Sequence, residues 1–304
     1  MSLFAKIRQN RRSVGYDMWG YAFISPFYIL FAIFGLYPLL FSFVLSFTDW
    51  KGRGPLNFIG LKNYALMLQD KVFWQSVQNG VIIFLIYVPI MTLLALALAV
   101  ILNSPRIRGY KFFRLIIFLP YITNMVAAGF VFQSLLNQEV GLFNLALKAM
   151  GLPVVPWLNS VWGARVSLGI LVTWAWLGYN MVIMLAGLQT IDKEVTEAAL
   201  IDGATPVQSF FLITIPLLRP VILFSVILST IGSFGLFTEL VSLFPQSQGT
   251  GPLNSTVTPL LVIFKQTFSN FRFGYASALG YSFFALIFVV TILQFRMFNR
   301  GEEQ

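Results

Sequence analysis

Long stretches of apolar residues are the feature that most limits what this chain can fold into. An α-helix needs about 20 mainly apolar residues to cross the roughly 30 Å hydrocarbon core of a bilayer. Hydrophobic residues make up 58% of the 304-residue chain and charged residues 10%, whereas a soluble domain carries about 25% charge. The stretches that are long enough lie at residues 18–47, 79–102, 112–136, 166–188, 210–243 and 275–298. The sequence therefore predicts an all-α, multi-pass membrane protein of about six transmembrane helices.

The chain is predicted to form one domain between two short tails. We expect an N-terminal tail at residues 1–17, a transmembrane domain at 18–298 and a C-terminal tail at 299–304. The apolar stretch that follows the basic run from Lys6 to Arg12 is far longer than the core of a signal peptide, which spans about 7–15 residues. We therefore expect this segment to stay in the protein as the first span.

Two of the apolar stretches are longer than one membrane crossing requires, and both contain prolines. A proline inside a helix removes a backbone hydrogen bond and commonly kinks the helix. We therefore expect a kinked or interfacial section in the first and fifth spans. The prolines are Pro26, Pro38, Pro216 and Pro220.

The distribution of Lys and Arg predicts that both termini are cytosolic. Cytosolic loops carry an excess of positive residues, and the N-terminal tail and the short loop at 103–113 hold most of the bias in this chain. The formal charge of +9 is therefore explained by membrane topology. We expect membrane lipid around the chain and no nucleic acid partner.

Several chemistries are excluded because the required residues are missing. The chain has no cysteine and no histidine, which excludes disulfides, thiolate nucleophiles, Cys/His zinc sites and histidine-dependent acid–base catalysis. It also lacks a G-x-x-x-x-G-K-[ST] phosphate-binding loop. We therefore predict that the chain is not an enzyme and holds no metal or cofactor, so that energy from ATP would have to come through another subunit.

The connection between the fourth and fifth spans, at residues 189–209, is acidic although the protein is basic. It holds four carboxylates against the single cation of Lys193. This charge is compatible with a basic partner and equally with a loop that is only solvated. Asp192 could cap a short helix there, Gly203 could end it in the left-handed conformation, and Pro206 would prevent its continuation.

The same connection resembles the EAA loop of binding-protein-dependent ABC importer permeases, whose short coupling helix docks in a cleft of the ATPase subunit. Val207, Phe211 and Leu212 depart from the family's pattern. The residues that match its spacing are Glu197, Ala198, Ala199, Asp202, Gly203, Ala204, Phe210, Ile213, Pro216, Leu217 and Pro220. For coupling to the ATPase, the resemblance implies Glu197, Ala198, Ala199, Asp202, Gly203, Ala204 and Pro216.

Shorter matches along the rest of the chain, at residues 58–64, 118–120 and 273–278 among others, are similar to the carbohydrate-uptake, maltose-type permeases. The resemblance implies a type I ABC importer permease fold in the cytoplasmic membrane of a bacterium or archaeon. It also implies a carbohydrate substrate and three kinds of partner. These are a second homologous permease, an ATPase dimer that binds ATP and Mg, and an extracytoplasmic sugar-binding protein.

Polar and aromatic residues that share a helical face are candidates for the sugar pathway, because sugars bind to hydrogen-bonding groups and flat aromatic faces. Small serines four residues apart equally serve close helix packing, and Trp or Tyr can anchor a helix at the interface. Both readings stay open. The candidates are Thr173, Trp176, Tyr179 and Asn180 in the fourth span, Ser229 and Ser233 in the fifth, and Tyr281 in the sixth.

The alternative function is an ion-coupled secondary transporter of small solutes. Proton coupling usually needs an ionisable residue at membrane depth. Arg114, Arg219 and Glu239 are expected near span ends, and the middles of the predicted spans lack charged residues. This argues against a proton relay, while sodium held by backbone carbonyls stays possible.

Overall fold

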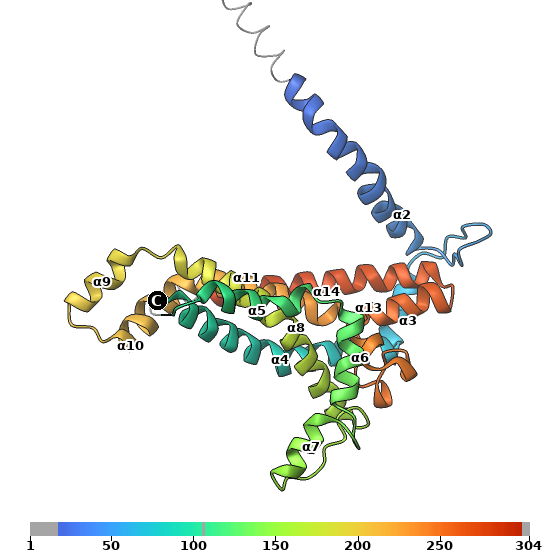
Figure 1. Cartoon of the computed structure of the whole chain (residues 1–304). Helices are drawn as coiled ribbons and strands as arrows, with labels where there is room; N and C mark the ends of the chain where they lie inside the picture. Colours follow the sequence, from blue (N-terminus) through green and yellow to red (C-terminus); the bar gives the residue numbers. More distant parts are fainter. Residues whose placement is uncertain (1–17, 105–106, 300–304) are drawn as a thin grey trace, which may run out of the picture. The chain divides into compact units, whose positions relative to one another are not determined.

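The computed structural model describes residues 18–104 and 107–299, which are almost entirely helical (Figure 1). Two compact units divide the chain: Met1–Leu68 with Gln266–Tyr281, and Gln69–Lys265 with Ser282–Gln304. The predicted N-terminal tail and nearly all of the C-terminal tail lie outside the described residues. The single-domain boundaries and the cytosolic position of the termini therefore stay predictions.

Within the described residues, five helices are long and apolar enough to cross a membrane, and a bent pair of helices can supply a sixth crossing. This confirms the predicted all-α membrane fold, but the fifth span ends at residue 234 instead of 243. The five helices are Met18–Leu45, Lys71–Asn103, Val161–Gln189, Pro206–Phe234 and Phe273–Phe298.

The predicted third span is a pair of helices that meet at 95°. Helix α5 (Tyr110–Ile122) ends at Thr123, whose backbone is extended, and α6 (Met125–Leu135) then begins. The Asn124 side chain starts this second helix by accepting hydrogen bonds from the backbone N–H groups of Val126 and Ala127 at 2.9 and 3.2 Å. The predicted third stretch at 112–136 is therefore present, but it is bent because this cap turns the chain within an apolar segment.

Both proline-containing spans have the irregular sections that their sequences predict. A π-helical turn at Ala32–Leu36 precedes Pro38 at the start of α2 (Tyr37–Leu45). A second one at Phe210–Thr214 precedes Pro216 at the start of α11 (Ile215–Phe234). Each turn shifts the hydrogen-bond pattern by one residue just before a residue that lacks an N–H donor.

The first unit is organised around the chain that leaves the first span. The Asn63 amide of α3 (Lys62–Gln69) donates to the backbone carbonyls of Ser46 and Thr48 at 2.9 and 2.8 Å. The beginning of α14 (Phe273–Asn299) packs against the same turn, since a Cβ at Gly274 would lie 2.1 Å from the Thr48 carbonyl oxygen. These contacts connect the first and last spans within this unit.

The second unit packs around α8 (Val161–Gln189), which lies beside α4 (Lys71–Asn103). The apolar window of α8 is 56% buried, against 28% or less for the other spans. A core cluster of this unit is formed by buried residues of α4, α8 and α11, namely Ala95, Ala99, Leu102, Met181, Met184, Leu185, Leu188 and Leu218. Figure 1 shows α7 (Leu142–Ala149) at one end of this unit and α9 (Lys193–Ile201) with α10 (Pro206–Ser209) at the other.

The chain after α11 turns back along α6 instead of continuing as a span. Helix α12 (Thr238–Leu243) approaches α6 so closely that a Cβ at Gly129 would lie 2.0 Å from the Ser242 hydroxyl oxygen. After α13 (Pro259–Phe264) the chain leaves this unit, and it returns in the second half of α14. Helix α12 is thereby placed beside α6 and α8, where the candidate site lies.

Candidate coupling loop and transport cavity

The acidic connection forms the short helix that its sequence predicts, α9. Gly203 has φ +90°, and its N–H donates to the Leu200 carbonyl at 3.2 Å while the Ala204 N–H donates to the Ala199 carbonyl at 3.0 Å. This pair of hydrogen bonds is the Schellman termination, in which the first residue after the helix cap, here Gly203, adopts the left-handed conformation. The sequence prediction of a glycine stop is confirmed.

The beginning of α9 differs from the prediction. Asp192 holds the N-cap position with an extended backbone, but its side chain makes no capping hydrogen bond. Pro206 also does more than end α9, because it occupies the first turn of α10. Thr205 and Gln208 form a capping box there: Gln208 N–H donates to the Thr205 hydroxyl at 3.2 Å, and Thr205 N–H donates to the Gln208 side-chain oxygen at 2.8 Å.

The surface of this connection is apolar as well as acidic. Ile201 is 86% exposed and Val207 is 65% exposed, and the Glu197 side chain is also exposed. Exposed apolar side chains beside charged ones are typical of surfaces that bind another protein. The Gly203 stop of α9 and the capping box of α10 fix the turn between the two helices, at the beginning of the span that contains Pro216.

A cavity of about 320 Å³ lies among α4, α8, α11 and α12. It gathers four of the predicted pathway residues, Trp176, Tyr179, Asn180 and Ser229. Tyr121 of α5 holds the aromatic side chains in place: its ring stacks on Tyr179 with centroids 4.7 Å apart and meets Trp176 edge to face at 5.3 Å. The cavity therefore offers both aromatic faces and hydrogen-bonding groups.

Asn180 lines the cavity and also connects helices. Its amide donates to the Trp176 carbonyl at 3.0 Å, and its side-chain oxygen accepts a short hydrogen bond from the Ser225 hydroxyl of α11. The first interaction is partly buried and the second is buried, so much of its hydrogen-bonding capacity is already used within the fold.

The other predicted pathway residues lie elsewhere. Thr173 and Ser233 do not line the cavity, and the Ser233 hydroxyl instead hydrogen-bonds the Tyr87 hydroxyl at 2.9 Å. Tyr281 belongs to the first unit, where its hydroxyl donates to the Leu39 carbonyl. The structure thus brings together some of the predicted pathway residues, and the roles of all of them in transport stay predictions.

The sequence reading missed the two cavity residues Tyr87 and Glu239. Tyr87 lies in an apolar run of α4 and donates to the Ser229 carbonyl at 3.1 Å. Glu239, expected near the end of a span, is buried in α12 and lines the cavity together with Trp176. Because the fifth span was taken to run to residue 243, nothing in the sequence signalled that α12 turns Glu239 toward α8.

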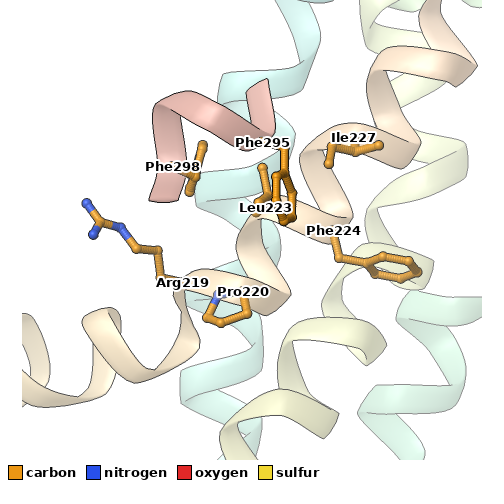
Figure 2. A pocket seen from close by; sticks show the side chains of 7 residues that line it. All are labelled: Arg219, Pro220, Leu223, Phe224, Ile227, Phe295 and Phe298. Carbon is orange, nitrogen blue, oxygen red and sulfur yellow. The ribbon is translucent and has the colours of Figure 1, made fainter. Parts of the chain in front are cut away.

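A second cavity, of about 330 Å³, lies between α11 and the end of α14 (Figure 2). Six of its seven lining residues are apolar, and Arg219 extends outward at its edge. Such a surface suits lipid chains and offers little for the hydroxyl groups of a sugar. The cavity beside Trp176 is therefore the candidate transport site.

Comparisons with known proteins give the family. Residues 73–301 match the family model "Binding-protein-dependent transport system inner membrane component". The lactose transport system permease protein LacF of Rhizobium radiobacter is 43% identical, over 92% of this chain and 94% of that protein. The arabinooligosaccharides transport system permease protein AraP of Halalkalibacterium halodurans is 32% identical, over 93% and 89%.

A solved structure shows the same fold. A chain of a bacterial ABC transporter involved in the import of alginate superposes with a TM-score of 0.79 at 21% identity, covering 96% of this chain and 99% of that one. The family match spans most of the sequence, so the secondary-transporter alternative is not supported. The chain belongs to the binding-protein-dependent transport system inner membrane components, and it is the multi-pass permease subunit of an ABC importer rather than a catalytic subunit.

Proposed function

We propose that this permease imports a carbohydrate, with an ATPase dimer that binds ATP and Mg, a second homologous permease and an extracytoplasmic sugar-binding protein as partners. The two permeases together form the translocation pathway. The lactose and arabinooligosaccharide permeases named above support the substrate class. The cavity beside Trp176 supports it too, because its aromatic rings and polar groups are of the kind that bind sugars.

The observation that carries the coupling role is the exposed connection around α9, in which Gly203 ends α9 and a capping box begins α10. The resemblance to the EAA loop assigns the contact with the ATPase to Glu197, Ala198, Ala199, Asp202, Gly203, Ala204 and Pro216. Ile201 and Val207 add exposed apolar surface to that acidic segment. A helix suits the transmission of movement from the ATPase to the spans, because a hydrogen-bonded helix moves as a rigid body.

Reconstitution of all partners in vesicles tests this function. We expect uptake of radiolabelled lactose or an arabinotriose to require ATP on the coupling-helix side and the binding protein on the other side. Uptake driven by a proton or sodium gradient without ATP would contradict the proposal. So would ATP-dependent transport of amino acids but none of the sugars.

The proposed orientation places the coupling helix and both termini in the cytosol. The sequence has no native cysteine, so a single cysteine reports its own side of the membrane. A cysteine at Met150, in the connection after α7, should react with an impermeant maleimide in intact cells, and one at Gln208 should react only after lysis. The opposite pattern would reverse the orientation.

Replacing Trp176 should impair transport without unfolding the protein. Trp176→Ala removes an aromatic face of the cavity, so we expect sugar uptake to fall at least tenfold while the complex with the ATPase still forms. Uptake and pull-down assays measure the two effects. Asn180→Ala should also lower uptake, but with some loss of stability, because the Ser225 hydroxyl loses its buried acceptor.

The matched control is Trp162→Ala on the same helix. Trp162 is 62% exposed, does not line the cavity and contacts Arg165, so uptake should stay normal. If the Trp176→Ala and Trp162→Ala variants take up sugar equally well, the polar and aromatic face of α8 serves helix packing and does not bind the sugar.

A further inference from the structure

A groove of about 540 Å³ lies at the end of the second unit near α7, separate from the cavity beside Trp176. It runs between the end of α6, the connection that precedes α8 and the chain that follows α12. Leu243 and Phe244, both buried, lie beneath it. Its polar lining consists of Gln133, Ser134, Asn137, Gln138, Asn159, Gln246 and Ser247.

Several of these amides have free hydrogen-bonding capacity. Among the described residues, Gln133 and Gln246 make no side-chain hydrogen bond. Asn137 uses only its side-chain oxygen, which accepts from the N–H groups of Glu139 and Val140 at 2.9 and 3.2 Å. Each amide has two donors and an acceptor, so the groove offers many of the bonds that a polyhydroxylated ligand needs.

A buried side chain connects the backbone segments beside the groove. Asn144 of α7 is fully buried, and its amide donates to the Gln138 and Val155 carbonyls at 3.0 and 2.9 Å. Its oxygen accepts from the Trp157 indole at 3.0 Å. These bonds fix the connection that supplies Gln138 and Asn159, so a ligand would bind to preorganised groups.

The groove lies close to the cavity along α12 and far from the coupling connection along α8. Glu239 lines the cavity and Leu243 lies beneath the groove, and these residues are one turn, about 6 Å, apart along α12. Asn159 precedes α8 and the coupling connection follows it, so the 29 residues of α8 separate the two by about 44 Å. The groove thus lies at the end opposite the coupling helix (Figure 1).

We propose that this groove is an entry subsite for carbohydrate, at which the amides bind sugar hydroxyl groups released on the outer side before the sugar reaches the cavity beside Trp176. The inference rests on the proposed function, because it takes the coupling helix to be cytosolic and the substrate to be a sugar. It adds a binding site on the outer face that is distinct from the cavity within the spans.

The test uses the reconstituted importer with lactose and arabinotriose as probes. The double variant Gln133→Ala/Gln246→Ala removes two free amides and should raise KM for uptake about tenfold, since each lost hydrogen bond to a bound ligand weakens binding severalfold. We expect unchanged basal ATP hydrolysis and unchanged binding of the sugar-free binding protein. A cysteine at Asn159 should be protected from a maleimide by saturating transported sugar, whereas the control cysteine at Met150, which is exposed outside the groove, should not.

The outcomes separate the two proposals. An unchanged KM together with no protection at residue 159, in an importer that takes up sugar normally, would overturn the entry subsite and leave the proposed function intact. Weaker binding of the sugar-free binding protein to the double variant would assign the groove to protein docking and also overturn it. If the unmodified importer took up neither probe, the proposed sugar function would fail and the subsite with it.

Discussion

Gly178→Val is expected to prevent the second unit from packing correctly. A Cβ at residue 178 would lie 2.1 Å from the Ile117 carbonyl oxygen and 2.7 Å from the Phe118 Cα. Both are backbone atoms of α5, which cannot rotate away as a flexible side chain can. Helices α5 and α8 would have to separate, at the upper end of the about 1–3 kcal/mol usual for overpacking, and Tyr121 would lose its contacts with Trp176 and Tyr179.

The measurements are the yield of monodisperse protein in detergent and its thermal unfolding. Gly280→Val on α14 makes the same substitution within a helix where a new Cβ meets no atom within 4 Å. We expect a marked loss of folded protein for the first variant and little change for the second. Equal yields and equal melting temperatures would show that α5 and α8 do not approach as closely as described.

The number of spans could be predicted from the sequence because bilayer thickness sets the length of an apolar helix. The 95° bend between α5 and α6 could not, since both halves are apolar and a hydropathy window averages over Thr123 and Asn124. The signal that was present is local: an asparagine before Met125 is a common helix start. The same averaging merged α12 with the fifth span.

The coupling loop could be predicted in more detail because its structure is set by neighbouring residues. Gly203 and its two donors need only the backbone of α9. The cavity depends instead on residues from several helices. Helical spacing identified Trp176, Tyr179 and Asn180, but it could not show that Tyr87 and Glu239 meet them, because those contacts depend on how α4 and α12 pack against α8.

Gly203→Val is expected to uncouple ATP hydrolysis from sugar uptake. At φ +90° a residue with a Cβ costs about 1–2 kcal/mol, and a β-branched one more. Nothing lies within 4 Å of the position that the new Cβ would take, so the effect comes from the backbone alone. The Schellman termination would open and α9 would change its angle to α10. We expect at least a tenfold loss of uptake per ATP hydrolysed, with normal membrane insertion because no span is altered.

A series at this position separates backbone geometry from side-chain contact. Gly203→Asp should also uncouple, while Gly203→Asn should retain most of the coupling, because asparagine tolerates the left-handed conformation. Glu197→Ala leaves the geometry intact and should weaken only the charged contact with the ATPase, so its effect should be smaller than that of Gly203→Val. Gly54→Val, at φ +80° with equally open surroundings, is the control for strain outside the coupling loop and should transport normally.

The readout is sugar-stimulated ATP hydrolysis and uptake in the same vesicles, with pull-down of the ATPase. If α9 transmits movement as a rigid body, Gly203→Val should reduce uptake even where the ATPase is still bound, since a helix held at the wrong angle can dock without driving the spans. Loss of ATPase binding in proportion to loss of uptake would instead make the loop a simple attachment site. Normal coupling in both the Val and the Asp variants would contradict the assignment of α9 as the coupling helix.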